Sequence, residues 1–175
     1  MILSAFSLEG KVAVVTGCDT GLGQGMALGL AQAGCDIVGI NIVEPTETIE
    51  QVTALGRRFL SLTADLRKID GIPALLDRAV AEFGHIDILV NNAGVCRLGS
   101  FLDMSDDDRD FHIDINIKGV WNVTKAVLPE MIARKDGRIV MMSSVTGDMV
   151  ADPGETAYAL TKAAIVGLTK SLAVE

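Results

Sequence analysis

The sequence has few cysteines and no long apolar run, and both absences limit where such a chain can work. Its three cysteines, Cys18, Cys35 and Cys96, show neither metal-ligand spacing nor a Cys-x-x-Cys pair, which is typical of reduced thiols in a cytosolic protein. No apolar run approaches the roughly 20 residues that a membrane span needs, and the first residues lack the segments of a signal peptide. We therefore predict a cytoplasmic protein without a metal site and without a membrane partner.

Positive charge is also scarce. The 175 residues include 15 Lys and Arg against 23 Asp and Glu, which gives a formal net charge of −8. Because nucleic acids and anionic membranes attract basic surfaces, this balance argues against both as partners. What the sequence does have is 49% hydrophobic residues and 18 glycines, a composition typical of a compact protein built around a buried sheet. The length favours a single domain over residues 1–175.

Short apolar runs alternate with longer segments of helical periodicity. Continuous apolar strands are typical of a parallel sheet that is buried on both faces. The alternation predicts an α/β fold, a doubly wound parallel sheet of five strands in the order 3-2-1-4-5 with helices on both sides. The strands are expected at residues 12–16, 36–42, 59–63, 86–90 and 138–143. The helices are expected at residues 21–33, 46–55, 69–83, 106–133 (with a break near Asn116) and 156–175.

A glycine-rich segment connects the first expected strand with the first expected helix. It has the spacing Gly-x-x-x-Gly-x-Gly from Gly17 to Gly23. Glycines permit a tight turn and a close approach of a diphosphate to the backbone, while the helix N-terminus offers free N–H groups. The alternative is a turn that merely packs the helix on the strand. The position between a strand and a helix favours a dinucleotide-binding loop.

Tyr158 and Lys162 stand four residues apart in the last expected helix. Residues four apart share one helix face, so the ammonium there favours the phenolate and makes the phenol usable as a general acid and base. Such a pair also occurs by chance on solvated helix faces, so its meaning depends on the rest of the chain.

With these two motifs the chain resembles the short-chain dehydrogenase/reductase family. Further matches keep the family's order and strand context over nearly the whole chain. They are Asp65 after the third strand, Asn91-Asn92-Ala93-Gly94 at the end of the fourth, Asn116 in the long helix and Ser143-Ser144 at the end of the fifth.

The resemblance implies an acid/base centre for hydride transfer between a secondary alcohol and a ketone. Tyr158 would exchange a proton with the substrate oxygen, and Lys162 would assist it and bind the nicotinamide ribose. Ser144 would hold the substrate oxygen, and Asn116 would hold a water that links Lys162 to solvent. The plain alternatives are a strand-end cap for Ser144 and a satisfied amide at a helix kink for Asn116.

The serine spacing departs from the family pattern. The family usually has its serine thirteen residues before the tyrosine, and this chain has Val145 there. Ser144 matches better by its place at the strand end, so we infer a one-residue insertion within residues 147–156. Ser143 is the second choice.

The resemblance also implies which residues would bind the dinucleotide. They are Gly17, Asp19, Thr20, Gly21, Leu22, Gly23, Asn41, Asp65, Leu66, Asn92, Ala93, Gly94, Tyr158 and Lys162.

The end of the second strand bears on the choice between NAD and NADP. An acidic residue there binds the ribose 2′-hydroxyl of NAD, and here Asn41 takes that place. No Arg or Lys occurs between Lys11 and Arg57, and Asp19 adds negative charge to the loop, so a 2′-phosphate finds no charge partner. We predict NAD as the cofactor rather than NADP.

Two parts of the chain resemble different members of the family. Residues up to about Gly94 resemble 2-deoxy-D-gluconate 3-dehydrogenases, and residues after about Ile86 resemble another bacterial oxidoreductase. A chimera joined within residues 86–94 is therefore a hypothesis, which would fail if both parts separately had the same nearest relative. The first part suggests a small sugar acid as substrate.

The family's last strands have no counterpart in this sequence. Their lack would leave the fifth strand at the sheet edge and an apolar face uncovered. The resemblance further implies a homodimer or homotetramer through the helices at residues 106–133 and 156–175. Two alternatives to an active oxidoreductase stay open. One is a truncated or chimeric dinucleotide-binding domain with little or no activity, and the other is a scaffold that binds no cofactor.

Overall fold

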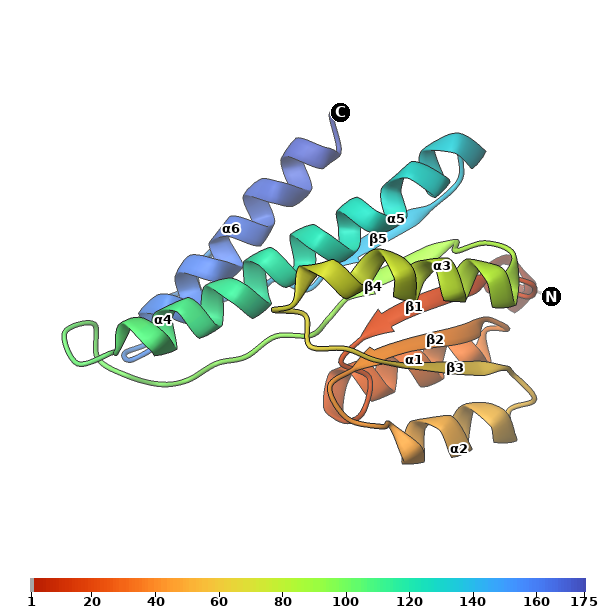
Figure 1. The fold of residues 1–175 in the computed structure, drawn as a ribbon, viewed down its shortest axis with the longest axis horizontal. Coiled ribbons are helices and arrows are strands. Elements are labelled where there is room, and N and C mark those ends of the chain that lie inside the picture. Colours follow the sequence, from red (N-terminus) through yellow and green to blue (C-terminus); the bar gives the residue numbers. More distant parts are fainter. Residues whose placement is uncertain (1) are drawn as a thin grey trace.

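Five parallel strands form one sheet at the centre of the molecule (Figure 1). The computed structural model describes residues 2–175, apart from the side chains of residues 2, 3 and 69. The strands are β1 (Val12–Thr16), β2 (Asp36–Asn41), β3 (Phe59–Thr63), β4 (Ile88–Asn91) and β5 (Arg138–Met141). Their order is β3-β2-β1-β4-β5, and every neighbouring pair is parallel. The predicted fold class and strand order are confirmed.

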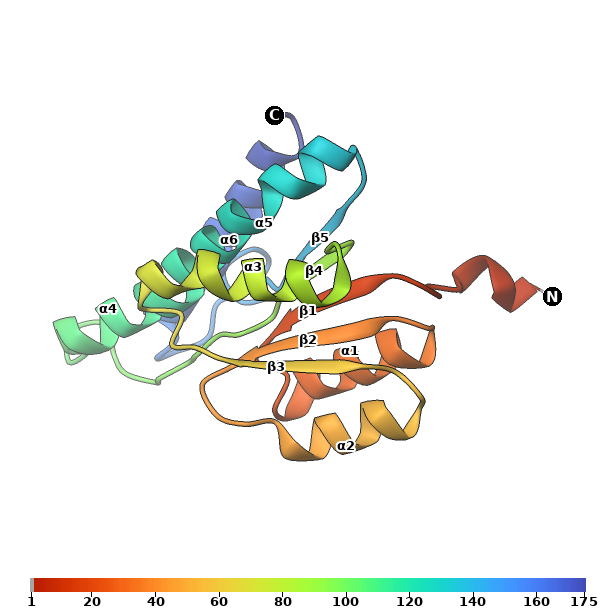
Figure 2. The ribbon, with the colours of Figure 1, turned by 45° about the vertical axis from the view of Figure 1, so that its right-hand side comes forward.

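Helices cover both faces of this sheet (Figures 1 and 2). One side carries α1 (Gly21–Gln32) and α2 (Thr46–Ala54), and the other carries α3 (Ile72–Phe83), α4 (Asp106–Ile113), α5 (Val120–Arg134) and α6 (Thr156–Leu172). Shorter helical segments are η1 (Ile2–Phe6), η2 (Ile69–Gly71) and η3 (Asp114–Gly119).

The alternation of side chains along β1 explains why two layers of helices are needed. Val12 and Val14 belong to the apolar cluster under α3 and α5, whereas Ala13 and Val15 belong to the cluster under α1 and α2. All are buried. Because burial of a valine or leucine side chain stabilises by roughly 1.5–3 kcal/mol, the two clusters hold the central strands in place. The carboxyl ends of β1 and β4 are thereby fixed side by side.

The long helical region of residues 106–134 begins with a strong cap and changes its winding in the middle. The Ser105 hydroxyl accepts the Asp108 N–H at 3.0 Å, and the first turn carries three aspartates, which suit the positive end of the helix dipole. The irregularity expected near Asn116 takes the form of a π-helical turn, η3, between α4 and α5, rather than a full break. Such a turn re-aims the side chains that follow.

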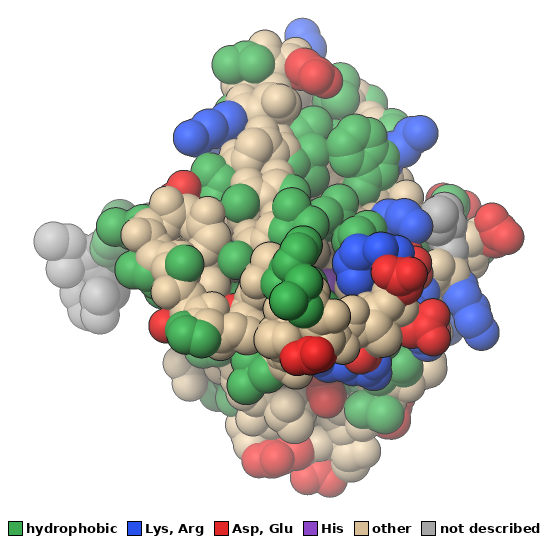
Figure 3. Space-filling view, turned by 90° about the vertical axis from the view of Figure 1, so that its left-hand side faces the viewer, with side chains coloured by type: hydrophobic (Ala, Val, Ile, Leu, Met, Phe, Trp, Pro, Cys, Tyr) green, Lys and Arg blue, Asp and Glu red, His purple; other side chains and the backbone are tan. Residues whose placement is uncertain are grey.

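The molecule exposes apolar surface at β5 and at two irregular segments near the pocket. Within the described residues β5 is a sheet edge, and its Val140 is 45% exposed. Two irregular segments, residues 92–105 and 142–155, meet through a hydrogen bond from Gly99 N–H to the Gly154 carbonyl at 3.0 Å. Figure 3 shows hydrophobic side chains gathered on this end of the molecule. The exposed apolar residues in the two segments are Leu98, Phe101, Leu102, Val145, Met149 and Val150.

None of the helices within residues 2–175 is both long enough and apolar enough to cross a bilayer. The same part of the chain holds no group of three or more His, Cys, Asp or Glu side chains placed to bind a metal ion.

Candidate active site

A pocket of about 630 Å³ opens at the carboxyl ends of the parallel strands. It lies at the loops that follow β1 and β4, the neighbouring strands at which the strand order reverses. Ligands of open parallel sheets bind at this switch point, and the volume suits a small molecule or cofactor. Every residue predicted to bind a dinucleotide lines this pocket, and their roles stay predictions. They are Gly17, Asp19, Thr20, Gly21, Leu22, Gly23, Asn41, Asp65, Leu66, Asn92, Ala93, Gly94, Tyr158 and Lys162.

Backbone geometry explains the glycines of the loop after β1. Gly17 and Gly21 have φ angles of 66° and 58°, which residues with a side chain rarely adopt. Gly23 has no room for a side chain, because a Cβ there would lie 1.9 Å from the Gly17 carbonyl oxygen. The helix α1 starts at Gly21, and its cap residue Thr20 makes no side-chain hydrogen bond to it. The first turn of α1 therefore offers N–H groups and the positive end of its dipole to an anion in the pocket.

Asn92 fastens the segment after β4 to the end of β1. Its Nδ2 donates to the carbonyl oxygens of Thr16 and Gly17 at 3.1 and 2.9 Å. In return the Thr16 hydroxyl accepts the backbone N–H groups of Asn92 and Ala93, both at 3.0 Å. These bonds fix the spacing between the two loops that form the pocket.

Asn41 ends β2, where the sequence predicts a contact with the adenosine ribose. It lines the pocket and is 3% exposed. Its Oδ1 accepts the Cys18 N–H at 2.6 Å, and its Nδ2 lies 3.6 Å from the Cys18 sulfur. The amide is thus largely engaged with the loop, and a ribose hydroxyl would have to use its second N–H. The next residue, Ile42, is 66% exposed and gives this end of the pocket an apolar rim.

Arg67 is a charged pocket residue that the sequence interpretation missed. Its Nε lies 2.9 and 3.0 Å from the two Asp65 oxygens, and its Nη2 lies 2.6 Å from Oδ2. The Arg67 guanidinium holds the pKa of the Asp65 carboxyl below its usual range. Because the two charges neutralise each other, Arg67 is not an isolated cation for a 2′-phosphate. Its position two residues after Asp65 is the sequence signal that points to it.

Tyr158 and Lys162 line the pocket from the first half of α6. The Lys162 ammonium lies 5.6 Å from the centre of the Tyr158 ring and donates to the Met142 carbonyl oxygen at 2.7 Å. Lys162 is 6% exposed, and burial lowers the pKa of its ammonium. The backbone after β5 thus holds the ammonium against the face of the phenol.

Asn116 is buried beside the pocket rather than in its lining. A Cβ added at Gly94 would lie 3.4 Å from both Asn116 Oδ1 and Lys162 Nζ, so the amide and the ammonium flank the same glycine. Asn116 Oδ1 accepts the Val95 N–H at 2.8 Å, and Nδ2 donates to the Val95 carbonyl at 2.9 Å and to Thr161 Oγ1 at 3.0 Å. These contacts make it a structural clamp, while its role in holding a water stays a prediction.

The two serines after β5 differ in position. Ser143 lines the pocket, and its hydroxyl donates to the Lys162 carbonyl at 2.9 Å. Ser144 does not line the pocket, and its Oγ accepts the Thr146 N–H at 3.2 Å. That bond leaves the Ser144 hydroxyl hydrogen for another acceptor. The geometry therefore brings the second-choice serine to Tyr158 and Lys162, and the choice between the two stays a prediction.

Other residues line the pocket but belong to none of the predicted motifs. Most of them adjoin predicted positions in the sequence, which is the signal that could have found them. Cys96 and Phe111 do not adjoin a predicted position, and no local pattern separates them from their neighbours. The unpredicted lining residues besides Arg67 are Ile40, Ile42, Ala64, Val95, Cys96, Phe111, Ile115 and Met142.

The fold and this pocket are those of the short-chain dehydrogenase/reductase family. The family model described as short chain dehydrogenase matches residues 11–175, so the chain belongs to this family. The C-terminal end of the match includes Tyr158 and Lys162, and its start precedes the loop after β1.

Two curated relatives are similar to this chain over nearly its whole length. Oxidoreductase UcpA of Escherichia coli (strain K12) is 67% identical over 169 residues, which cover 96% of this chain. The 2-dehydro-3-deoxy-D-gluconate 5-dehydrogenase of the same organism is 65% identical over 179 aligned positions, which cover 100% of this chain. The chain spans 64% of the length of the first protein and 69% of the second.

A solved structure shows the same fold with a nucleotide bound. Carveol dehydrogenase from Mycobacterium avium in complex with NAD is 33% identical and superposes with a TM-score of 0.90. The match covers 95% of this chain and 66% of that one.

Proposed function

We propose that this chain binds NAD and interconverts a secondary alcohol and a ketone by hydride transfer. The observation that carries the proposal is that one pocket holds both the N-terminus of α1 and the pair Tyr158 and Lys162. The first is suited to a diphosphate and the second to proton transfer at a carbonyl oxygen. Membership of the family and the NAD-bound relative support the same function.

The residues present fit a dinucleotide. Gly17, Gly21 and Gly23 line the pocket with bare backbone, and α1 begins there without a side-chain cap on its N–H groups. Asp65 lies at the end of β3, where its carboxylate would reach the adenine end. Asn92, Ala93 and Gly94 would support the middle of the molecule from the β4 side.

The reaction needs one proton and one hydride. The bound nicotinamide would supply or accept the hydride. The Tyr158 hydroxyl would donate its proton to the carbonyl oxygen during reduction and take it back during oxidation. The Lys162 ammonium, held by the Met142 carbonyl, would stabilise the phenolate that reduction leaves. Ser144 or Ser143 would orient the substrate oxygen, and Asn116 would hold a water beside Lys162.

The rim of the pocket favours NAD over NADP. Asn41 brings no positive charge, Ile42 offers apolar surface, and Arg67 is already paired with Asp65. A 2′-phosphate would therefore have to break an existing ion pair to gain a partner. Saturation with NADPH at a lower concentration than with NADH would contradict this choice.

A small sugar acid is the substrate class we propose, because one relative is named a 2-dehydro-3-deoxy-D-gluconate 5-dehydrogenase. The second candidate is a dinucleotide-binding domain with little or no turnover. The specific observation in its favour is the exposed edge at β5 together with the apolar segments beside the pocket. They leave the reaction end of the pocket, at Tyr158 and Lys162, less enclosed than the phosphate end, at the loop from Gly17 to Gly23.

Self-association and location belong to the same proposal. We expect a homodimer or homotetramer through residues 106–133 and 156–175, because these helices expose Trp121, Ile132 and Leu160. A cytoplasmic location stays a prediction.

Titration with NADH, followed by addition of a ketone, tests the function. NADH fluorescence should saturate, and 2-dehydro-3-deoxy-D-gluconate should then oxidise the NADH. Tyr158→Phe keeps the ring but removes the proton donor, so turnover should fall by about 10²–10⁴-fold while NADH binding stays unchanged. Binding without turnover in the unmodified protein would favour the second candidate, and failure to bind NADH would contradict both.

A further inference from the structure

One wall of the pocket comes from a segment without regular secondary structure. Residues 92–100 follow β4 as irregular backbone, and Val95 and Cys96 line the pocket. This wall adjoins the reaction centre, since Gly94 lies beside the Lys162 ammonium. An irregular segment keeps one position only where its backbone groups find partners. The partners of this wall therefore decide how firmly it is held.

Two side chains from the long helical region hold this backbone. Asn116 binds both polar groups of Val95, as described above. Four residues earlier, His112 Nε2 accepts the backbone N–H of Arg97 at 2.9 Å. Residues four apart share one helix face, so the two side chains form a double clamp on residues 95–97.

The hydrogen bonds of His112 define its protonation. Nδ1 lies 2.7 Å from the Asp108 carbonyl oxygen, which can only accept, so Nδ1 carries the hydrogen. Nε2 then has the lone pair that the Arg97 N–H requires. His112 is 0% exposed, and both ring nitrogens of the neutral imidazole are satisfied. The ring thus links the backbone of α4 directly to the pocket wall.

The side chain of Arg97 adds contacts of a weaker kind. It pairs with Asp108 at 2.6 Å and lies over the Phe111 ring at 3.8 Å, but 52% of the side chain is exposed. Exposed ion pairs contribute little to stability. The bond to the buried His112 ring is part-buried and is therefore the firmer attachment of residue 97.

We propose that His112 is a positioning residue that fixes the reaction-side wall of the pocket through the backbone of Arg97. The effect on catalysis rests on the proposed function, whereas the effect on the wall does not. The clamp also reaches the helix that carries the phenol. Asn116 donates to Thr161 Oγ1, and that hydroxyl donates to the Tyr158 carbonyl at 2.7 Å. Loss of the His112 acceptor should loosen the wall relative to Tyr158 and leave the phosphate end unchanged.

Two substitutions of similar polarity test whether the hydrogen-bond acceptor of His112, rather than the rest of its ring, holds the wall. His112→Gln places an amide oxygen near the position of Nε2 and can still accept the Arg97 N–H. His112→Asn places its amide near the position of Nδ1 and cannot reach Arg97. Hydrogen exchange of the Arg97 amide, measured by NMR, should be about fivefold faster in the Asn variant and within about twofold of wild type in the Gln variant. The KM for 2-dehydro-3-deoxy-D-gluconate should rise by a similar factor in the Asn variant only, with NADH affinity unchanged in both.

The outcomes separate this inference from the proposed function. If the Arg97 amide exchanges at the same rate in both variants, the positioning role is overturned. The same holds if the KM rises equally in both variants. Absence of turnover in wild type would count against the proposed function, while amide exchange would still decide the role of His112. If a variant fails to fold, exchange in the unmodified protein decides instead. Its Arg97 amide should exchange several-fold more slowly than that of Leu98, and equal rates would contradict the clamp.

Discussion

The two ends of the pocket are held in different ways. At the phosphate end, β1 is buried at every residue, and the loop after it takes its shape from backbone angles at Gly17 and Gly21. At the reaction end, β5 is exposed or half-buried throughout, and the wall depends on side chains such as His112 and Asn116. The loop after β1 therefore takes its shape mainly from backbone geometry, whereas the wall on the side of Tyr158 and Lys162 is held by single hydrogen bonds.

The difference has a physical origin in the fold. A parallel strand between two helix layers is fixed by apolar burial on both faces, which needs no specific partner. An irregular wall has no such support and must be held by individual polar groups, each worth about 0.5–1.5 kcal/mol. We therefore expect substitutions at the phosphate end to act on NADH binding and folding together, and those in the reaction-side wall to act on the wall and the reaction while NADH binding is kept.

The largest effect is expected from a side chain added within the phosphate loop. In Gly23→Ala the new Cβ would meet the Gly17 carbonyl at 1.9 Å and Asn92 Nδ2 at 2.5 Å. The free energy of unfolding should fall by about 3 kcal/mol or more, and NADH binding should be lost. Urea denaturation and NADH fluorescence measure the two quantities.

Gly25 provides the matched control on the same helix. A Cβ at Gly25 would meet nothing within 4 Å, so Gly25→Ala should keep NADH binding and stabilise α1 by up to about 1 kcal/mol. Normal NADH binding by Gly23→Ala would contradict the idea that backbone geometry holds this end.

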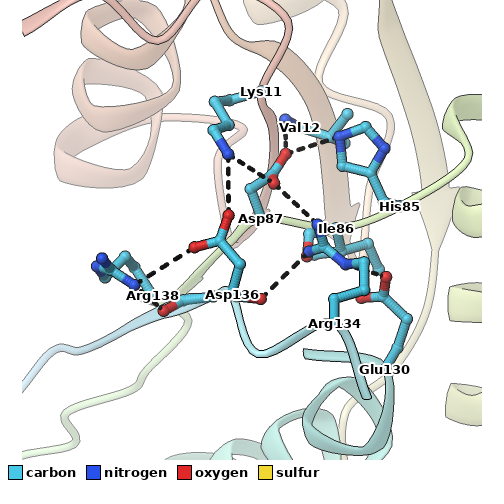
Figure 4. A network of polar contacts seen from close by, with 10 residues as sticks. Lys11, Val12, His85, Ile86, Asp87, Glu130, Arg134, Asp136 and Arg138 are labelled. Carbon is cyan, nitrogen blue, oxygen red and sulfur yellow. Dashed lines mark hydrogen bonds and ion pairs between the residues drawn. The ribbon is translucent and has the colours of Figure 1, made fainter. Parts of the chain in front are cut away.

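A buried carboxylate lies at the amino ends of the strands, opposite the pocket (Figure 4). Asp87, 3% exposed, accepts the Val12 N–H at 2.9 Å. It also lies 3.2 Å from Lys11 Nζ, 3.2 Å from Arg134 Nη1 and 2.9 Å from His85 Nε2. The group thus ties the starts of β1 and β4 to the end of α5.

Replacement of this carboxylate should destabilise the contacts of β1 and β4 with α5. Asp87→Asn removes the buried charge that Lys11 and Arg134 contact, while Lys11 keeps its ion pair with Asp136 and Arg134 its ion pair with Glu130. Because charged hydrogen bonds are lost, the free energy of unfolding at neutral pH should fall by about 2 kcal/mol. NADH affinity should change little, because the site lies far along the strands from the pocket. Glu50→Gln, an exposed change on α2, is the control and should leave stability unaltered.

The pH dependence of Asp87→Asn follows from the same contacts. Burial alone would raise the pKa of Asp87, but the Val12 N–H and the Lys11 ammonium outweigh it and keep the pKa below its usual range. A carboxyl with a depressed folded-state pKa stabilises above its unfolded pKa of about 3.9, and this contribution is lost as pH falls through the folded value. The difference between wild type and Asp87→Asn should therefore be constant near neutrality and shrink below about pH 4. A difference that persists unchanged in acid would show that shape rather than charge matters at this position.

The sequence contained most of the phosphate end and less of the reaction end. The strands and the glycine loop were predictable because apolar periodicity and glycine spacing act locally. The irregularity near Asn116 was also predictable, but its π-helical form at Asp114–Gly119 was not. His112 resembles an ordinary core histidine in the sequence, and its partner Arg97 is fifteen residues away in an irregular segment. The bond between Asn41 and Cys18 likewise forms only once β2 lies beside β1.

The last prediction concerns the reactivity of the thiols, which probes the two ends without altering them. Cys18 belongs to the phosphate loop and Cys96 to the reaction-side wall. Cys18 in the phosphate loop and Cys35 beyond α1 are fully buried, and burial raises the pKa of each to about 11. Cys96 is exposed in the reaction-side wall, although partial burial and the charge of Glu155 also raise its pKa. Since the thiolate is the reactive form, one thiol should react with a disulfide reagent at about pH 8 in the folded protein, and three in urea. Cys96→Ser should abolish the fast reaction, and NADH should slow it in wild type if the nucleotide occupies the pocket. Reaction of Cys18 at the same rate as Cys96 would mean that the phosphate loop opens as readily as the wall, which is the outcome that the contrast between the two ends forbids.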